Sequence, residues 1–142
     1  MPRKKTDYIF IHCSATRPSQ DWVNADEIDK WHRARGFFSI GYTYVILRDG
    51  TIETGRDLDA PTASQKGYNH NSVSICMIGG VTEDDITVAE KNFTEEQFDS
   101  LKKILLKLQG IYPEAKIVGH NEFSKKDCPS FDVQQWLSEI TL

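Results

Sequence analysis

The chain has few of the features that mark secreted, membrane or disulfide-stabilised proteins. Its 142 residues include three cysteines, Cys13, Cys76 and Cys128, and an odd number without a leader sequence indicates reduced thiols rather than a disulfide framework. No apolar run is long enough to cross a bilayer. The short run 8–11 does not resemble a secretory signal. We therefore expect no membrane insertion and a protein that stays in the cytoplasm until it is released.

Positive charge is also scarce. Lysine and arginine number 17 against 21 aspartates and glutamates, for a formal net charge of −4, which argues against nucleic acid as a partner. We expect the one basic cluster, residues 3–5, to be a solvated arm. The sequence contains no repeats, linkers or low-complexity segments. With 39% hydrophobic and 11% aromatic residues, the chain is expected to form one domain over residues 1–142.

The pattern of apolar residues predicts strands that alternate with helices. Strands are expected at 7–12, 42–48, 51–54, 72–78 and 116–119, with helices starting after Asn24, Thr94 and Asp132. These three residues are good helix N-caps. The order predicts an α/β fold with a central mixed β-sheet flanked by helices. The segments 56–71 and 81–92 lack periodicity and are expected to be loops.

The segment 119–132 contains the most distinctive chemistry of the chain. His120 follows a predicted strand, Cys128 lies eight positions later, and His12 ends the first strand. Zinc binds histidine nitrogen and cysteine sulfur, and catalytic zinc sites use three protein ligands. Alternation along a strand directs His12 and Cys13 to opposite faces, so only one of them can face a shared metal. The alternative of structural imidazoles and a buried thiol stays open at this point.

Two further residues are candidates for catalysis. Lys126 precedes Cys128 by two positions, and its ammonium could face negative charge that develops on a substrate. Tyr42 opens a strand, where its phenol could orient water. A solvated lysine and a half-buried sheet aromatic are the alternatives. We expect His32 to be a hydrogen-bonded core or supporting histidine, His70 to face solvent, and the two cysteines within strands to serve packing.

Motifs spread along nearly the whole chain resemble one enzyme family. They are Ile11-His12-Cys13-Ser14-Ala15-Thr16, Trp31-His32, Gly41-Tyr42, Arg48-Asp49-Gly50-Thr51, Gly55-Arg56, Gly67-Tyr68-Asn69-His70-Asn71-Ser72, Gly79-Gly80, and His120 through Cys128-Pro129-Ser130-Phe131-Asp132. This ordered set resembles the zinc-dependent N-acetylmuramoyl-L-alanine amidases of the type 2 family, which are related to peptidoglycan recognition proteins. The resemblance is strongest to single-domain phage lysozymes.

The resemblance implies the roles of five residues. His12, His120 and Cys128 would bind one zinc ion, and Tyr42 and Lys126 would be catalytic. The fold would be that of amidases and peptidoglycan recognition proteins, with a groove for the muramyl peptide.

The implied activity is that of an endolysin from a phage or prophage. Zinc-activated water would hydrolyse the amide between N-acetylmuramic acid and L-alanine. The partner would be peptidoglycan, and the protein, expected to be a monomer, would act on the cell wall after release. A non-catalytic peptidoglycan-binding module and an unrelated zinc hydrolase are the alternatives. Ser64-Gln65 replaces a loop histidine of many relatives, which bears on substrate contacts rather than on zinc.

Overall fold

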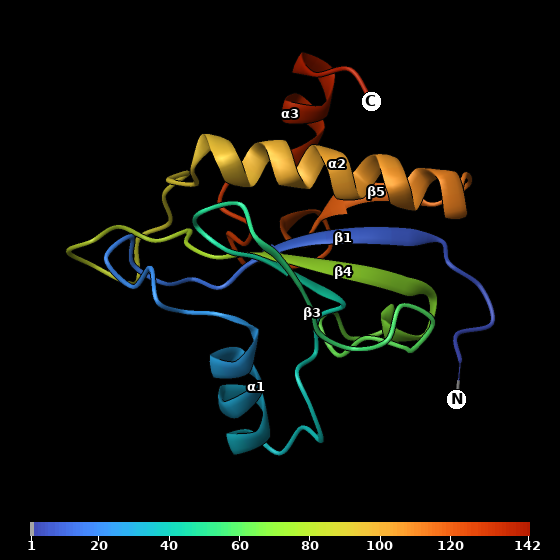
Figure 1. Ribbon diagram of the computed structural model, residues 1–142, viewed down its shortest axis with the longest axis horizontal. Helices are drawn as coiled ribbons and strands as arrows, with labels where there is room; N and C mark the ends of the chain where they lie inside the picture. Colours follow the sequence, from blue (N-terminus) through green and yellow to red (C-terminus); the bar gives the residue numbers. More distant parts are fainter. Residues whose placement is uncertain (1) are drawn as a thin grey trace.

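The computed structural model describes residues 2–142 and shows a five-stranded sheet with helices on both faces (Figure 1). The strands are β1 (Tyr8–Cys13), β2 (Tyr44–Ile46), β3 (Ile52–Thr54), β4 (Ser72–Met77) and β5 (Lys116–Gly119). The α-helices are α1 (Ala25–Ala34), α2 (Glu95–Ile111) and α3 (Val133–Glu139), and the short 3-10 helices are η1 (Asn69–Asn71) and η2 (His120–Glu122). The predicted element order and α/β class are confirmed. None of the helices in this range is long and apolar enough to cross a membrane.

The strand order, β3-β2-β4-β1-β5, brings distant parts of the sequence together. Only the β2–β3 pair is antiparallel, so the sheet is mixed as predicted. His12 of β1 lies opposite Cys76 of β4, and Ile11 lies opposite Gly119, the last residue of β5. The carboxyl ends of β1 and β5 therefore meet at one edge of the sheet, where His12 and His120 become neighbours.

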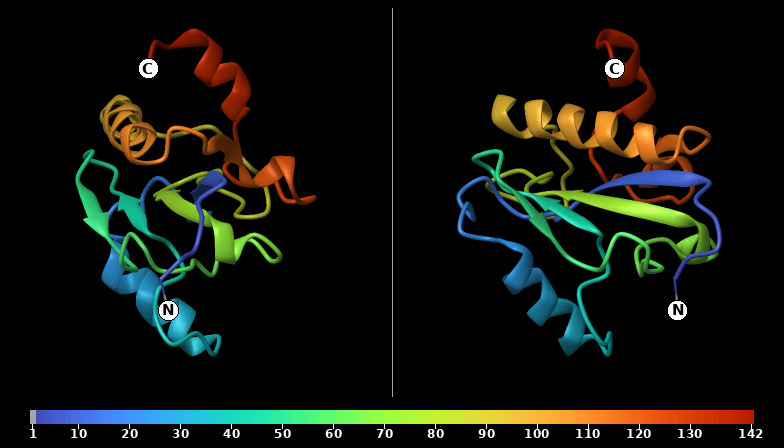
Figure 2. Two further views of the ribbon diagram at one scale, coloured as in Figure 1. Left: turned by 90° about the vertical axis from the view of Figure 1, so that its right-hand side faces the viewer. Right: turned by 45° about the vertical axis from the view of Figure 1, so that its right-hand side comes forward.

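The two faces of the sheet are covered by different helices (Figure 2). Helices α2 and α3 pack on one face, where Ile9 and Ile11 of β1 join a large apolar cluster that includes Leu105 of α2. Helix α1 covers the other face through Ile28, which packs in a smaller cluster with Val45 of β2. Both faces of β1 and β4 are buried, as expected for parallel strands between two layers.

The helices begin where the sequence predicts. The Asn24 side chain accepts a hydrogen bond from the backbone of Glu27. Thr94 and Gln97 form a capping box in which each side chain bonds the backbone of the other residue. Asp132 accepts from the backbone N–H of the residue three positions on and caps α3. These bonds satisfy amides at the helix starts, which have no partner inside the helix.

The strand predicted over 42–48 is shorter in the structure. Regular pairing begins at Tyr44, because the carbonyls of Tyr42 and Thr43 accept hydrogen bonds from Arg56 and Gly55 where the chain leaves β3. Tyr42 therefore lies in an irregular segment just before β2.

The prediction of a solvated N-terminal arm is wrong for Arg3. Its guanidinium donates hydrogen bonds to the carbonyls of Leu58 and Ala60 and to the hydroxyl of Tyr112. A guanidinium has five donors and can satisfy several acceptors of an irregular loop at once. Arg3 thus ties the start of the chain to the loop after β3, whereas the Lys5 ammonium is exposed and pairs with Asp7 at 3.2 Å.

Candidate metal centre

Two imidazoles meet at the carboxyl ends of β1 and β5. His12 is 1% exposed, and its Nδ1 lies 3.2 Å from Nδ1 of His120, the first residue of η2. The turn at η2 is held by Glu122, whose carboxylate accepts a hydrogen bond from the backbone N–H of Gly119. Parallel pairing of β1 and β5 fixes the distance between the two backbones. The two ring nitrogens therefore face each other because of the sheet topology.

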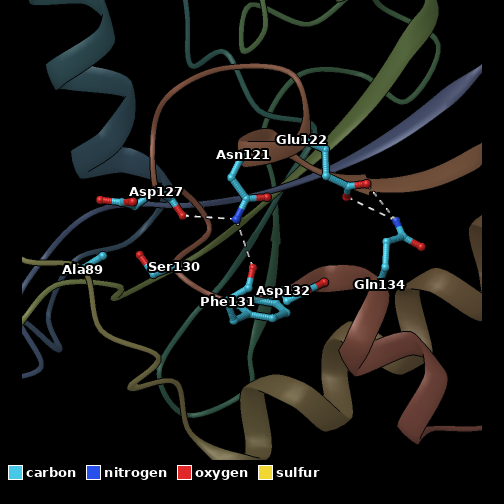
Figure 3. Close-up of a pocket in the computed structure, with 8 residues that line it drawn as sticks. All are labelled: Ala89, Asn121, Glu122, Asp127, Ser130, Phe131, Asp132 and Gln134. Carbon is cyan, nitrogen blue, oxygen red and sulfur yellow. Dashed lines mark hydrogen bonds between the residues drawn. The ribbon is translucent and has the colours of Figure 1, made fainter.

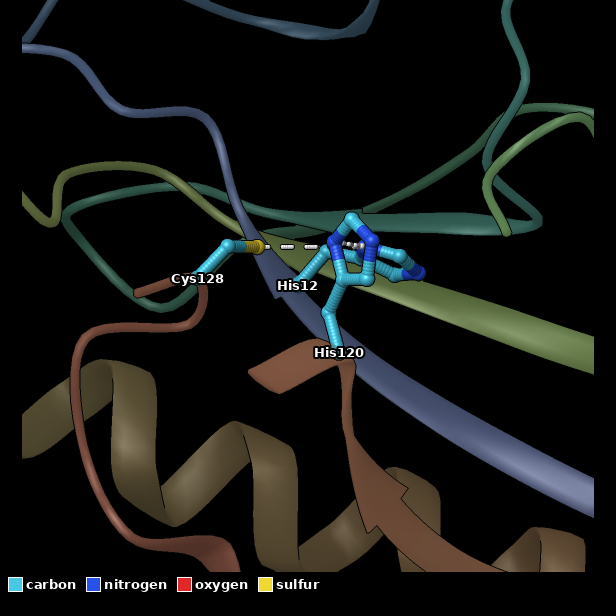
Figure 4. A group of neighbouring side chains, drawn as sticks. All are labelled: His12, His120 and Cys128. Carbon is cyan, nitrogen blue, oxygen red and sulfur yellow. Dashed lines mark hydrogen bonds between the residues drawn. The ribbon is translucent and has the colours of Figure 1, made fainter. Parts of the chain in front are cut away.

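The thiol of Cys128 completes this group (Figure 4). Its Sγ lies 3.8 Å from Nδ1 of His12, and it accepts a hydrogen bond of 3.1 Å from the backbone N–H of Cys13. One ligand atom from each of His12, His120 and Cys128 lies within 4.8 Å of the other two. Two imidazole nitrogens and one thiol are donors that zinc prefers. The residues present fit a single zinc ion with three protein ligands.

The surroundings of both imidazoles favour the neutral form. Burial lowers the pKa of His12 well below its usual value of 6.5, and the neighbouring His120 and Lys126 lower it further. Burial and then the charge of Lys126 also lower the pKa of His120. A neutral imidazole has the free lone pair that a metal needs, so the environment prepares both rings as ligands.

The pKa of the Cys128 thiol is shifted in the opposite direction. The contact with the Cys13 thiol, followed by burial, raises the pKa of Cys128 well above its usual value. A cation that binds here must therefore displace a proton from the sulfur, which makes binding dependent on pH. The backbone N–H of Cys13 points at the same sulfur and supports its negative charge once the proton has left. No local sequence pattern predicts this contact, because it joins residues 115 positions apart.

Tyr42 lies beside the paired imidazoles. Its ring centroid is 5.3 Å from that of His12 and 5.3 Å from that of His32. Burial raises the pKa of Tyr42 well above its usual value, so the phenol keeps its proton and can donate a hydrogen bond. His32 is buried as predicted, and its Nδ1 accepts a 2.8 Å hydrogen bond from the backbone N–H of Gly41. His32 thus fixes the backbone immediately before Tyr42.

Lys126 is exposed on the loop between η2 and α3. Its backbone N–H donates to the hydroxyl of Ser124 at 3.2 Å, and its ammonium forms no ion pair within residues 2–142. The charge of Lys126 lowers the pKa of both His12 and His120. The lysine is therefore close enough to act on the site while its ammonium stays available.

The other histidine and cysteine predictions concern His70, Cys76 and Cys13. His70 is exposed and Cys76 is fully buried, as expected. Cys13 is buried at the end of β1, and its thiol also lies 3.8 Å from the hydroxyl of Ser130. Packing is therefore only part of its role, because its backbone also contacts the sulfur of Cys128.

A hollow of about 630 Å³ lies beside the loop that carries Cys128 (Figure 3). None of the three candidate ligands lines it. Inside it, the side-chain amide of Asn121 donates to the carbonyls of Asp127 and Phe131. These two bonds join the start of the loop to its end, so Asn121 stabilises the shape of the loop that presents Cys128.

The fold and the site together define an α/β protein with a three-ligand candidate metal centre at the carboxyl edge of its sheet. A family model described as N-acetylmuramoyl-L-alanine amidase matches residues 2–131, and the chain belongs to that family.

Its relatives include phage enzymes of similar length. The chain is 46% identical to the endolysin of Escherichia phage T7, covering 94% of this chain and 87% of the relative. It is 44% identical to the endolysin of Enterobacteria phage T3, covering 95% and 87%. The family, and the function of a peptidoglycan amidase of the endolysin type, are therefore confirmed as predicted.

Solved structures support the fold. The N-acetylmuramoyl-L-alanine amidase LysC from Clostridium intestinale superimposes with a TM-score of 0.80 at 24% identity, covering 95% of this chain and 85% of that one. Bumblebee PGRP-SA gives a TM-score of 0.78 at 22% identity, covering 95% and 81%. The predicted amidase and recognition-protein fold is thus confirmed.

Proposed function

We propose that the chain hydrolyses the amide between N-acetylmuramic acid and L-alanine with one zinc ion held by His12, His120 and Cys128. The observation that carries the proposal is the convergence of these three ligand atoms within 4.8 Å in a member of the amidase family. Bound zinc would supply a Lewis acid and lower the pKa of a bound water from about 15.7 to about 7.

The ligand residues set the charge of the site. His12 and His120 would hold the ion as neutral imidazoles, and Cys128 would contribute one negative charge as a thiolate, so the formal charge with a divalent ion would be only +1. A site with this low charge stabilises a developing oxyanion less strongly than a site of three neutral ligands. Help from a further cation therefore becomes more valuable.

Lys126 and Tyr42 supply that help in our mechanism. The Lys126 ammonium stabilises the negative charge that develops on the scissile carbonyl oxygen, and the protonated phenol of Tyr42 orients the attacking water. Loss of one oxyanion donor costs about 2.7–4 kcal/mol in well-studied hydrolases. The free ammonium of Lys126 and the raised pKa of Tyr42 support these assignments.

The proposal also covers the setting in which the enzyme acts. Residues 1–142 form one catalytic domain that works as a monomer on peptidoglycan. The protein is made in the cytoplasm and reaches the wall once a separate factor has breached the membrane. This placement rests on the likeness to phage endolysins.

The test combines metal analysis with an assay on purified cell wall. The parent protein should contain about one zinc per chain by the three-ligand argument and should release new free amines without new reducing sugar ends. Cys128→Ser should lower zinc content and amine release together, whereas the exposed control His70→Ala should match the parent. Binding to the wall without amine release would instead favour a recognition module. Inactivity on the wall with activity on soluble amides would favour a different hydrolase.

A further inference from the structure

Two buried polar atoms lie without hydrogen-bond partners on the face of the sheet that α1 covers. They are Nε2 of His12 and Oγ of Ser74, and neither finds a partner among residues 2–142. Both side chains are almost completely inaccessible, at 1% and 0% exposed. A third such atom, Oδ1 of Asn71, lies just before the first residue of β4, whereas His12 lies beside the last residues of that strand. Buried polar groups almost always have partners, so each exception needs an explanation.

The register of the sheet places the first two atoms on one face. Phe10 of β1 lies opposite Ser74 of β4, and His12 lies opposite Cys76. Paired residues of neighbouring strands project to the same side, so His12 and Ser74 are diagonal neighbours. Neighbouring strands lie about 4.8 Å apart and two residues rise about 6.6 Å along a strand, so such neighbours are about 8 Å apart in the backbone, which a long side chain can span.

The orientation of the His12 ring favours this contact. Nδ1 faces His120 and Cys128, so the ring uses that nitrogen for the proposed metal. In Figure 4 the other nitrogen lies on the side of the ring away from Cys128. A neutral imidazole that binds metal through Nδ1 must carry its proton on Nε2, which makes Nε2–H a donor in need of an acceptor.

We propose that Ser74 is a positioning residue for the metal centre, with its Oγ accepting the hydrogen bond from Nε2–H of His12 when Nδ1 binds zinc. This inference rests on the proposed function. The bond is not made in the structure described, so it requires a change in the orientation of the imidazole or of the serine side chain. Ser74 would then fix the tautomer and the ring orientation of His12.

Three neighbouring polar groups on this face are already engaged. The hydroxyl of Thr43 accepts a hydrogen bond of 3.2 Å from the backbone N–H of Ser74. The hydroxyl of Ser72 lies 3.3 Å from that of Thr62. The Cys76 thiol is directed at the carbonyl of the next residue at 3.9 Å. Ser74 therefore offers the one hydroxyl on β4 whose oxygen has no partner within residues 2–142.

The first experiment measures zinc affinity by competition with a chelator. Ser74→Ala should weaken zinc binding by about 10–100-fold, the usual cost of losing a partner of a metal-bound histidine. Ser72→Ala is the matched control, because Ser72 is a buried serine on the same strand and face with a partner of its own. It should bind zinc like the parent. Equal weakening in both variants would indicate a general packing effect and overturn the proposal.

The second experiment observes the hydrogen bond itself. In the zinc-loaded parent, nuclear magnetic resonance of ¹⁵N-labelled histidine should show a slowly exchanging Nε2 proton of His12 with a contact to the Ser74 side chain. Ser74→Ala should lose that protection. This measurement on the parent decides the question even if Ser74→Ala does not fold. A parent that binds zinc but exchanges this proton freely overturns the role of Ser74 alone, whereas a parent without zinc overturns the metal centre as well.

Discussion

The two faces of the sheet differ in what they bury, although the same strands supply both. Toward α2 and α3, alternate residues of β1 and β4 such as Ile9, Ile11 and Ile75 join the large apolar cluster. Toward α1, the intervening positions include His12 and Ser74, each with a polar atom that has no partner in the described part of the chain. The period of two along a strand permits this division. One face therefore provides the stability that allows the other to hold polar groups in an unfavourable environment.

Because the two faces bury different groups, stability and chemistry should be separable by mutation. A change on the α2 face should lower the free energy of unfolding and leave the site intact in every molecule that stays folded. A change at the carboxyl edge of the other face should lower activity and leave the free energy of unfolding unchanged. The following predictions test this division, starting with the largest expected effect.

Removal of a large side chain from the apolar face should have the largest effect. Leu105 is fully buried in α2, and Leu105→Ala should lower the free energy of unfolding by about 2–5 kcal/mol because it leaves a cavity. Denaturant unfolding of the metal-free protein measures the loss. The neighbouring Leu106 is 45% exposed, and Leu106→Ala should be nearly neutral. A fall in amine release per folded Leu105→Ala molecule would show that the two faces are not independent.

Removal of the Lys126 ammonium tests whether a change at the site lowers turnover without lowering stability. Lys126→Ala should keep zinc and stability but lower turnover by about 100–1000-fold, the cost of one oxyanion donor. The adjacent Lys125 is also exposed, and Lys125→Ala should match the parent in the amine-release assay. Equal rates for both variants and the parent would remove Lys126 from the mechanism.

The hydroxyl of Tyr42 should contribute less. Tyr42→Phe keeps the ring that packs between His12 and His32 and removes only the donor. A hydrogen bond to a charged group contributes about 1.5–3 kcal/mol, so turnover should fall by roughly 10–150-fold. Zinc content and the denaturation midpoint should not change. Turnover at the parent's level would mean that the site requires the aromatic ring of Tyr42 and not its hydroxyl.

Much of this division could be predicted from local patterns. Helix caps at Asn24, Thr94 and Asp132 follow from short-range side-chain chemistry, and all three form in the structure. Alternation along β1 separates His12 from Cys13. The grouping of His12 with His120 could be proposed because both end predicted strands, and the sheet order then makes those strands neighbours.

Other features depend on contacts between distant segments and have no local signature. The bonds from Arg3 to the loop after β3 join residues more than fifty positions apart. The backbone contact from Cys13 to Cys128 spans the chain in the same way. The unpartnered Ser74 hydroxyl could not be expected either, because a serine in a strand gives no sign of whether its neighbours supply a partner. Such features appear only when the topology is known.

The smallest effect should be a change in how stability depends on pH, and it tests the α1 face outside the candidate metal centre. Burial, with Arg35 and Arg56, lowers the pKa of His32 below its usual 6.5, and its Nδ1 must stay unprotonated to accept the Gly41 N–H. The unfolded chain therefore binds more protons, so stability of the metal-free protein should fall as pH drops through about 6.5.

His32→Gln should flatten part of that fall. Denaturant unfolding between about pH 7.5 and 5.5, a range that brackets the ordinary histidine pKa, measures the slope, and the exposed control His70→Gln should leave it unchanged. Part of the slope should persist in His32→Gln, because the pKa values of His12 and His120 are lowered too. A slope identical in His32→Gln and the parent would assign the whole effect to the paired imidazoles. The α1 face would then contribute to pH sensitivity only at its catalytic edge.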